Sequence, residues 1–194
     1  MITDHDRSGW IGASDVRYVM GDWKGKSFEK WWMQKLGLSR GHFENDYTLA
    51  GTHWEHKILD SLGIPGLEKD KQILLPEIRL RVNLDGNTPG RIYECKTYKA
   101  HGLSKDIKDF KTGICPRHYW MQVQVQIYAS RIYGADIVAY GLVPEDYSNY
   151  LRAVDPGRRK LIPVAYDPKW VENEYLPRHR KLCEFLKRGC WPDV

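Results

Sequence analysis

The chain has 194 residues, of which 42% are hydrophobic and 28% charged, and its formal net charge is +5 at pH 7. This composition is ordinary for one globular domain with a buried core, so we expect a single domain over residues 1–194. No apolar run is long enough to cross a membrane, and polar residues follow Met1, so we expect neither a membrane span nor a signal peptide. The positive charge is compatible with a polyanionic partner.

The cysteines and nucleotide-binding patterns exclude further classes. Cys95, Cys115, Cys183 and Cys190 form no CxxC pair, which argues against a zinc ribbon or an iron–sulfur cluster. Free thiols in a reducing cytoplasm explain them most simply. No GxxxxGK[ST] motif occurs, so we expect no nucleotide cofactor.

The first predicted helix starts near Ser14 and ends near Met20. Gly12 supplies the preceding turn, and Ser14 has the residue type of an N-cap. Free N–H groups, a serine hydroxyl and the nearby Arg7 could together bind a phosphate. The alternative is an ordinary helix cap.

Two further helices are predicted over 27–36 and 46–62. In the second, Glu55 shares a stripe with the apolar residues three, four and seven positions later, so it points inward. A buried carboxylate requires a cation or a hydrogen-bond donor, unless it reaches water at the margin of the stripe. His53 and His56 could share a metal, but no HExxH pattern supports this.

A β-hairpin is predicted next, from strands over 78–84 and 91–96 that flank a turn rich in Gly, Asn and Pro. Asp85 follows the first strand, and Glu94 and Lys96 lie on one face of the second. Two carboxylates can hold Mg²⁺, and a lysine can orient a water or stabilise a phosphate. The alternative is a surface salt-bridge cluster.

The polar segment 100–113 is predicted to be a mobile link near this site. Its Lys105, Lys108 and Lys111 are candidate phosphate contacts. An ordinary solvated loop explains the same composition.

A helix is predicted over 119–133, with an apolar stripe that includes Met121 and Val125. Gln122 and Gln126 lie beside this stripe and could point at a site or at solvent, whereas Gln124 lies on another face. Strands are predicted over 137–143 and 160–166, and a helix over 168–188. Between the strands, four basic residues form a phosphate-contacting rim or a solvated turn: Arg152, Arg158, Arg159 and Lys160.

Four stretches together resemble one nuclease family. In chain order, Glu55, Asp85 and Glu94-Cys95-Lys96 resemble the PD-(D/E)XK signature, although Leu84 stands where the proline of the name would be. More specifically, the chain resembles the lambda-exonuclease/YqaJ family of phage recombination nucleases. The matching stretches are Arg7 to Val16, Gly51 to Glu55, Leu84 to Gly86 with Glu94 to Lys96, and Tyr119 to Gln124.

The resemblance implies a restriction-endonuclease-like α/β core with a mixed sheet flanked by helices. It implies that Asp85, Glu94 and the Cys95 backbone carbonyl hold Mg²⁺, or Mn²⁺, and that Glu55 completes the metal site. It further implies roles for four more residues and suggests one more DNA contact. Lys96 would activate the attacking water, Gln122 would support the lysine or the scissile phosphate, Arg7 and Ser14 would hold a 5′-phosphate, and Gln124 is a candidate DNA contact.

The implied function is a 5′→3′ exonuclease that degrades one strand of linear duplex DNA and leaves 3′ overhangs. The resemblance also implies a homo-oligomer, a trimer in the family, acting beside a single-strand annealing protein in the bacterial cytoplasm. Two alternatives remain: an endonuclease on the same fold, and a DNA-binding module that has lost catalysis. Because all four of Glu55, Asp85, Glu94 and Lys96 are present, the sequence favours an enzyme.

Overall fold

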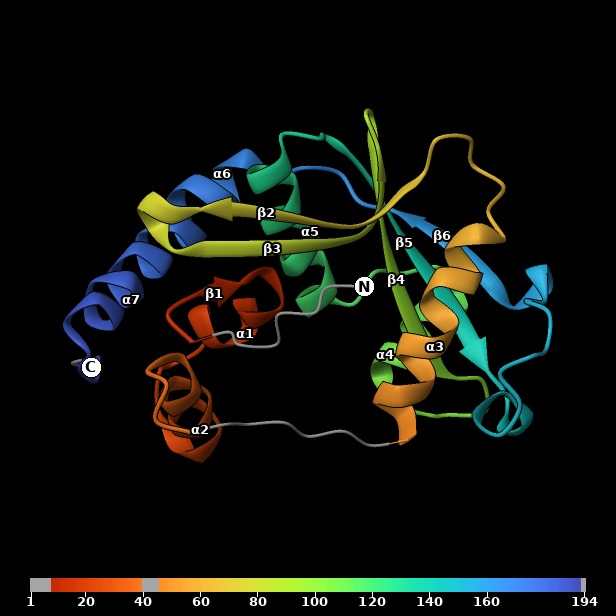
Figure 1. Ribbon diagram of the computed structural model, residues 1–194, viewed down its shortest axis with the longest axis horizontal. Coiled ribbons are helices and arrows are strands. Elements are labelled where there is room, and N and C mark those ends of the chain that lie inside the picture. The colour runs from red at the N-terminus through yellow and green to blue at the C-terminus, as the bar shows by residue number, and fades with distance from the viewer. Residues whose placement is uncertain (1–7, 40–45, 193–194) are drawn as a thin grey trace.

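A single six-stranded mixed sheet organises the computed structural model, which describes residues 8–39 and 46–192 (Figure 1). The strands lie in the order β1-β3-β4-β5-β6, and β2 pairs with β3. β3 pairs antiparallel with β2 and β4, whereas β4 and β5 run parallel. The strands are β1 (Ile11–Gly12), β2 (Glu68–Leu75), β3 (Leu80–Thr88), β4 (Arg91–Lys99), β5 (Gly134–Leu142) and β6 (Arg159–Pro163).

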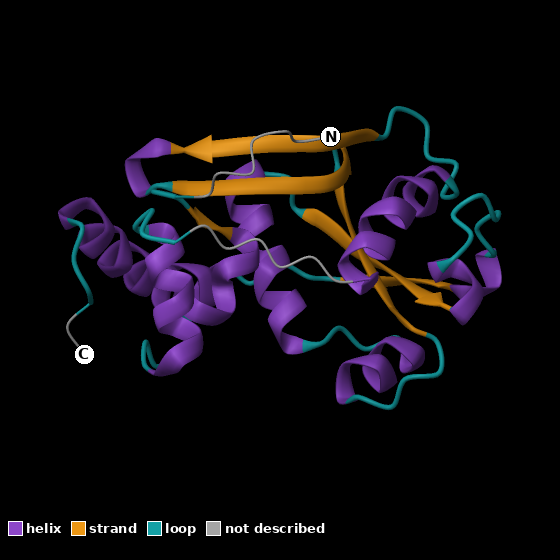
Figure 2. Ribbon diagram, turned by 60° about the horizontal axis from the view of Figure 1, so that its bottom comes forward, coloured by secondary structure: helices purple, strands orange, loops and turns teal. Residues whose placement is uncertain are grey.

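Helices cover both faces of this sheet (Figure 2). On one face, α3 packs against β4 and β5 through a cluster that includes Trp54 and Tyr140. On the other face, α5 lies against β2 and β3, and the short α1 and the C-terminal helix close the larger core. The helices are α1 (Val16–Val19), α2 (Gly25–Lys35), α3 (Asp46–Asp60), α4 (Lys105–Thr112), α5 (Arg117–Ser130), α6 (Pro168–Trp170) and α7 (Leu176–Arg188).

Most predicted elements are present, with shifted ends. The predicted helix over 168–188 is α6 and α7 joined by one π turn at Val171–Tyr175. The predicted strand over 160–166 ends earlier, because β6 stops at Pro163. Among the described residues, none of the helices has the length and apolar character that a membrane span requires.

The hairpin turn is tighter than the sequence indicates. β3 continues to Thr88, because β2 pairs with it as far as Asn87, and Thr88 pairs directly with Arg91. Asp85 therefore lies within β3, and the expectation that it follows the end of the strand is wrong. Only Pro89 and Gly90 separate β3 from β4.

The segment predicted to be a mobile link contains a helix instead. The Ser104 hydroxyl caps α4 by accepting from the Ile107 N–H (3.4 Å), and Gly113, with φ +79°, ends the helix. Phe110 anchors α4 because its buried ring stacks between Tyr98 and Tyr119, each 5.5 Å away between ring centroids. One buried aromatic ring thus fixes a stretch whose other residues are mostly polar.

The predicted N-cap role of Ser14 is also wrong. The first helical turn begins at Ala13, and the Asp15 carboxylate accepts from the Gly12 N–H (2.7 Å). Asp15 also accepts from the Trp31 indole (2.9 Å) and pairs with the buried Lys35 ammonium (2.6 Å), which ties this turn to α2. The Ser14 side chain is exposed.

Candidate active site

The candidate site lies where the sheet opens. β2 occupies one edge of β3 along most of its length. The other edge pairs with β1 at Leu80–Arg81 and with β4 only from Gly86 onward, so residues 82–85 have no strand partner on that side among the described residues. Buried backbone groups require partners, so side chains must supply them in this gap.

Asp85 and Gln126 supply those partners. The Cys95 N–H of β4 donates to Asp85 Oδ2 (2.9 Å), and Gln126 Nε2 from α5 donates to the Asn83 carbonyl (3.2 Å). We call residues 82–85 with these two bridging side chains the open edge of β3. It brings a carboxylate of β3 next to the backbone of β4, as the resemblance requires for Asp85 and Cys95.

Glu94 is the centre of the site and is almost fully buried. Its Oε1 accepts from Lys96 Nζ and from Gln122 Nε2, both at 2.5 Å, and its Oε2 accepts from Gln126 Nε2, also at 2.5 Å. The Glu94 side chain is 1% exposed, so these three donors offset the loss of its hydration. Gln122 and Gln126 come from one face of α5, since they are four residues apart.

The acidic groups outnumber the cations. Burial first, and then the charge of Glu94, raises the pKa of Glu55 to about 6. The same two causes raise the pKa of Asp85 well above its usual value. Burial disfavours the Lys96 ammonium, but the charges of Glu94 and Asp85 outweigh burial and raise its pKa, so Lys96 stays charged. Three carboxylates around one ammonium leave an excess of negative charge that a bound cation would relieve.

Tyr119 completes the wall beside Lys96. The Lys96 ammonium lies 5.3 Å from the centre of the Tyr119 ring, and burial raises the pKa of the Tyr119 hydroxyl. A cavity of 410 Å³ begins at Thr97, the residue after Lys96, and Tyr98, Phe110 and Tyr119 are among the residues that line it. The hollow thus lies beside the part of β4 that follows Lys96.

Gln124 has no access to this hollow. Its side chain is fully buried, its Nε2 donates to the Ala165 carbonyl (2.9 Å), and its Oε1 accepts from the Asp167 N–H (2.7 Å). Both ends of the amide hold the segment after β6, so the expectation of a DNA contact at Gln124 is wrong. The resemblance gave no role to Gln126, which donates to Glu94 Oε2. Its spacing of four residues from Gln122 already predicted that the two side chains share one side of the helix.

The expected phosphate contacts are only partly described. Arg7 lies outside the described residues, and Ser14 is exposed at the first helical turn. One turn later, the Arg17 guanidinium donates to the Tyr18 hydroxyl (2.8 Å) and lies 4.7 Å from the centre of that ring. Burial first and also the charge of Arg17 lower the pKa of His118, next to Tyr119, so Arg17 lies near the site although its sequence gave no signal.

The three α4 lysines are exposed, but none of them lines the hollow, to which α4 and its N-cap contribute Ser104, Asp106, Ile107 and Phe110 instead. Lys105, Lys108 and Lys111 project from a helix fixed by Phe110, and Lys111 Nζ donates to the Gly102 carbonyl (3.3 Å). The basic residues after β5 serve another purpose. Arg152 and Arg158 pair with the buried Asp146, and Arg159 donates to Ser61.

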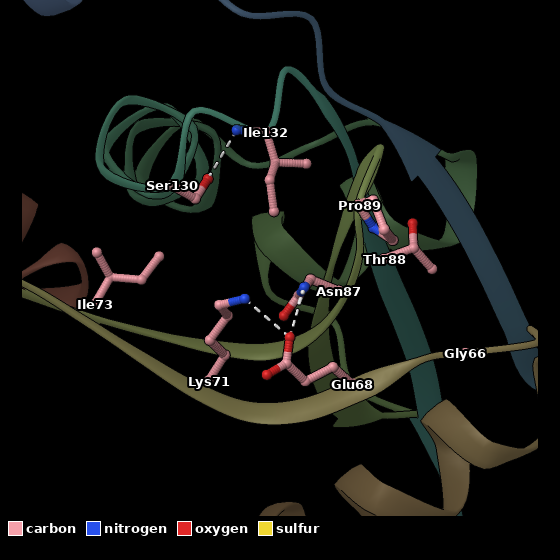
Figure 3. Close-up of a pocket in the computed structure, with 9 residues that line it drawn as sticks. All are labelled: Gly66, Glu68, Lys71, Ile73, Asn87, Thr88, Pro89, Ser130 and Ile132. Carbon is pink, nitrogen blue, oxygen red and sulfur yellow. Dashed lines mark hydrogen bonds and ion pairs between the residues drawn. The ribbon is translucent and has the colours of Figure 1, made fainter.

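A second cavity, also of 410 Å³, shares no lining residue with the acidic site (Figure 3). In it, Glu68 accepts from Lys71 Nζ (2.9 Å) and from Asn87 Nδ2 (3.3 Å). Ile73 follows on the same strand, and Ile132 lies on the other side of the hollow. The charge excess described above is absent from this lining, so we place the candidate chemistry at the open edge of β3.

Solved structures share this fold. An alkaline exonuclease from Laribacter hongkongensis (LHK-Exo) superposes with a TM-score of 0.65 at 21% identity, covering 94% of this chain and 93% of its own; its complex with dAMP gives 0.66 at 22%, with the same coverage. A phage-related exonuclease from Haemophilus somnus 129PT gives 0.57 at 15%, covering 93% and 92%. The chain has the fold of these exonucleases. The predicted α/β fold, a mixed sheet flanked by helices, is therefore confirmed. The neighbours are consistent with a restriction-endonuclease-like core and with the resemblance to the lambda-exonuclease/YqaJ family.

Sequence comparisons alone do not reach this fold. No protein-family model and no curated protein matches the chain. The shared fold extends over almost the whole length of both chains at low identity, so the conserved feature is the arrangement of the elements.

Proposed function

We propose that this protein is a Mg²⁺-dependent 5′→3′ exonuclease that degrades one strand of linear duplex DNA from 5′-phosphorylated ends. The observation that supports this most strongly is the gathering of Glu55, Asp85, Glu94 and Lys96 at the open edge of β3. The four groups come from α3, β3 and β4, far apart in the chain. The similarity of the fold to an alkaline exonuclease and a phage-related exonuclease agrees with it.

The donor set suits a hard divalent cation. Asp85, Glu94 and the Cys95 carbonyl offer only oxygen atoms, which Mg²⁺ prefers, and Mn²⁺ accepts them as well. The raised pKa values of Asp85 and Glu55 mark carboxylates that lack a compensating positive charge. When bound, the metal would lower the pKa of a water and neutralise charge on the phosphate.

The chain's own residues would hold and orient the reacting groups. Lys96 and Gln122 now share Glu94 Oε1. A metal ligand role for Glu94 would release one of these donors, which could then bind the attacking water or a phosphate oxygen. Gln126 would keep Glu94 oriented through Oε2. It would also continue to occupy the Asn83 carbonyl at the open edge of β3.

The choice of DNA ends would come from the N-terminal segment. By resemblance, Arg7 and Ser14 hold the 5′-phosphate, and Arg17, near Tyr119, adds a positive charge on this side. Digestion from that end gives 3′ overhangs suited to single-strand-annealing recombination with an annealing protein. By resemblance, we also propose a homo-oligomer, a trimer around the DNA, in the bacterial cytoplasm.

The test uses linear duplex DNA with 5′-phosphate or 5′-hydroxyl ends, and a covalently closed circle, each with Mg²⁺ or EDTA. We expect Mg²⁺-dependent loss of the phosphorylated linear DNA, slower loss of the hydroxyl-ended DNA, and an intact circle. Cutting of the circle would favour an endonuclease. Binding of DNA without cleavage in any arm would leave only a DNA-binding module.

A further inference from the structure

A second group of metal-ligand side chains lies next to the proposed active site. One ligand atom each from Glu55, His56 and Asp70 can be chosen so that all three lie within 4.8 Å of one another. His56 Nε2 lies 3.0 Å from Asp70 Oδ2. Within residues 8–39 and 46–192, no other set of three His, Cys, Asp or Glu side chains meets this distance.

The sequence alone suggested a different pairing for the histidines. His53 stacks on Tyr150, with 4.3 Å between ring centroids, and so turns away from His56. The partner of His56 comes from β2. Lys69 pairs with Gly86 and Lys71 with Leu84, so Asp70 lies opposite Asp85 at the one position where the β2–β3 ladder is interrupted. The second group therefore consists of two residues of α3 and one of β2, the strand that pairs with β3 along the edge opposite its open edge.

Glu55 belongs to both groups. It accepts no hydrogen bond and forms no ion pair within the described part of the chain, although it is half-buried and near Glu94 and Lys96. A carboxylate in such a position gains from a cation, because neither water nor a protein donor fully compensates its charge. This observation is independent of the contact between His56 and Asp70.

The donor chemistry separates the two groups. Mg²⁺ prefers oxygen ligands only, as at Asp85 and Glu94. An imidazole with two carboxylates suits Zn²⁺ and similar transition-metal ions, which commonly bind three such side chains and a water. The side chain of His56 is 39% exposed and that of Asp70 is 21% exposed, so an ion could enter from solvent.

We propose that Glu55, His56 and Asp70 form a second cation site that binds Zn²⁺ and shares Glu55 with the acidic site. Because one carboxylate serves both groups, Zn²⁺ draws Glu55 away from Glu94 and Lys96. Bound Zn²⁺ is then an inhibitor of the Mg²⁺-dependent reaction. This last consequence depends on the proposed function, whereas the binding of Zn²⁺ does not.

The first test measures Zn²⁺ binding by isothermal titration calorimetry, with excess Mg²⁺ present to occupy the oxygen-only site. We expect His56→Gln and Asp70→Asn to weaken the affinity for Zn²⁺ by more than about tenfold, since each removes one of three ligands. His53→Gln is the matched control, because His53 lies on the same helix and contacts only an aromatic ring among its described partners. The His53→Gln variant should bind Zn²⁺ with the affinity of the wild type.

The proposal is overturned if His56→Gln binds Zn²⁺ as tightly as the wild type, or if His53→Gln loses as much affinity. Circular dichroism of each variant shows whether it is folded. If His56→Gln does not fold, the Zn²⁺ affinity of Asp70→Asn decides the test.

The second test compares DNA cleavage in Mg²⁺ with and without added Zn²⁺. The ratio of the two rates should approach one in His56→Gln and stay at the wild-type value in His53→Gln. Equal inhibition of both variants would overturn the shared role of Glu55. If no variant cleaves DNA but Zn²⁺ binding still depends on His56, the second cation site stands and the proposed nuclease function fails.

Discussion

Two buried carboxylates in this protein have opposite surroundings. Asp146 is fully buried, and each of its oxygens faces a guanidinium: Oδ1 lies 3.2 Å from Arg152 and Oδ2 lies 2.5 Å from Arg158. Its Oδ2 also accepts from the Val143 N–H (3.0 Å). Glu94 is equally buried, but it shares a single ammonium, that of Lys96, with Asp85 and Glu55.

The comparison distinguishes Asp146, whose charge is neutralised within the fold, from the acidic site, whose negative charge is only partly neutralised. The positive partners of Asp146 are complete, so its cluster joins the turn after β5 to the segment before β6. The acidic site is incomplete in charge, and its excess is the property that a divalent cation would use. Substitutions in the acidic site should therefore reduce activity, whereas substitution of Asp146 should reduce stability.

The largest effect is expected for Lys96→Ala and Asp85→Asn. Each should reduce DNA cleavage by roughly a thousandfold, because it removes a group that stabilises the charged transition state or holds the metal. DNA binding, measured by fluorescence anisotropy, should change little. Lys69→Ala is the control, since Lys69 pairs with Asp60 at the surface. Cleavage by Lys96→Ala at near the wild-type rate would contradict the proposed role of the lysine.

The next effect is expected at Asp146. Asp146→Asn leaves Arg152 and Arg158 without their shared carboxylate, and should lower the free energy of unfolding by about 3 kcal/mol. Urea denaturation followed by tryptophan fluorescence measures this change. Glu145→Gln is the control: the Glu145 side chain is 68% exposed and lies 3.8 Å from Arg152, so its loss should change stability very little. Folded Asp146→Asn protein should still cleave DNA, and loss of cleavage would show that the cluster is more than structural.

The smallest effect, with the opposite sign, is expected for Glu55→Gln without metal. The pKa of Glu55 is raised from 4.5 to about 6 in the folded protein, so the contribution of Glu55 is favourable below pH 4.5 and is lost as pH rises through 6. At pH 7.5 in EDTA the variant should be more stable than the wild type by about 2 kcal/mol, and this gain should vanish near pH 4.5. Urea denaturation at both pH values measures it. A variant less stable than the wild type at pH 7.5 would show that Glu55 already has a compensating partner.

Local patterns predicted the parts of the site that each element carries by itself. The apolar stripe of α3 predicted an inward Glu55, and the alternation of β4 predicted that Glu94 and Lys96 share a face. The same reasoning singled out Gln122 and Gln126 as neighbours on α5, and the structure places both on Glu94. These inferences needed only the periodicity of a helix or a strand.

Contacts between elements distant in the sequence were not predictable in this way. The pairing of His56 with Asp70 depends on where α3 lies against β2, and the use of Gln124 depends on the path of the chain after β6. α4 was missed because a single buried ring, Phe110, decides it in a stretch of polar residues. The basic residues Arg152 and Arg158 gave no sign that Asp146 would hold them.

The open edge of β3 has one more consequence, for how the state of the site can be observed. The Cys95 amide proton is held by the Asp85 carboxylate (2.9 Å), where a regular sheet would use a backbone carbonyl. Any ligand that takes electron density from Asp85 changes the strength of that bond. The chemical shift and exchange rate of this single amide are therefore a natural reporter of occupancy, readable by nuclear magnetic resonance without a label on the DNA.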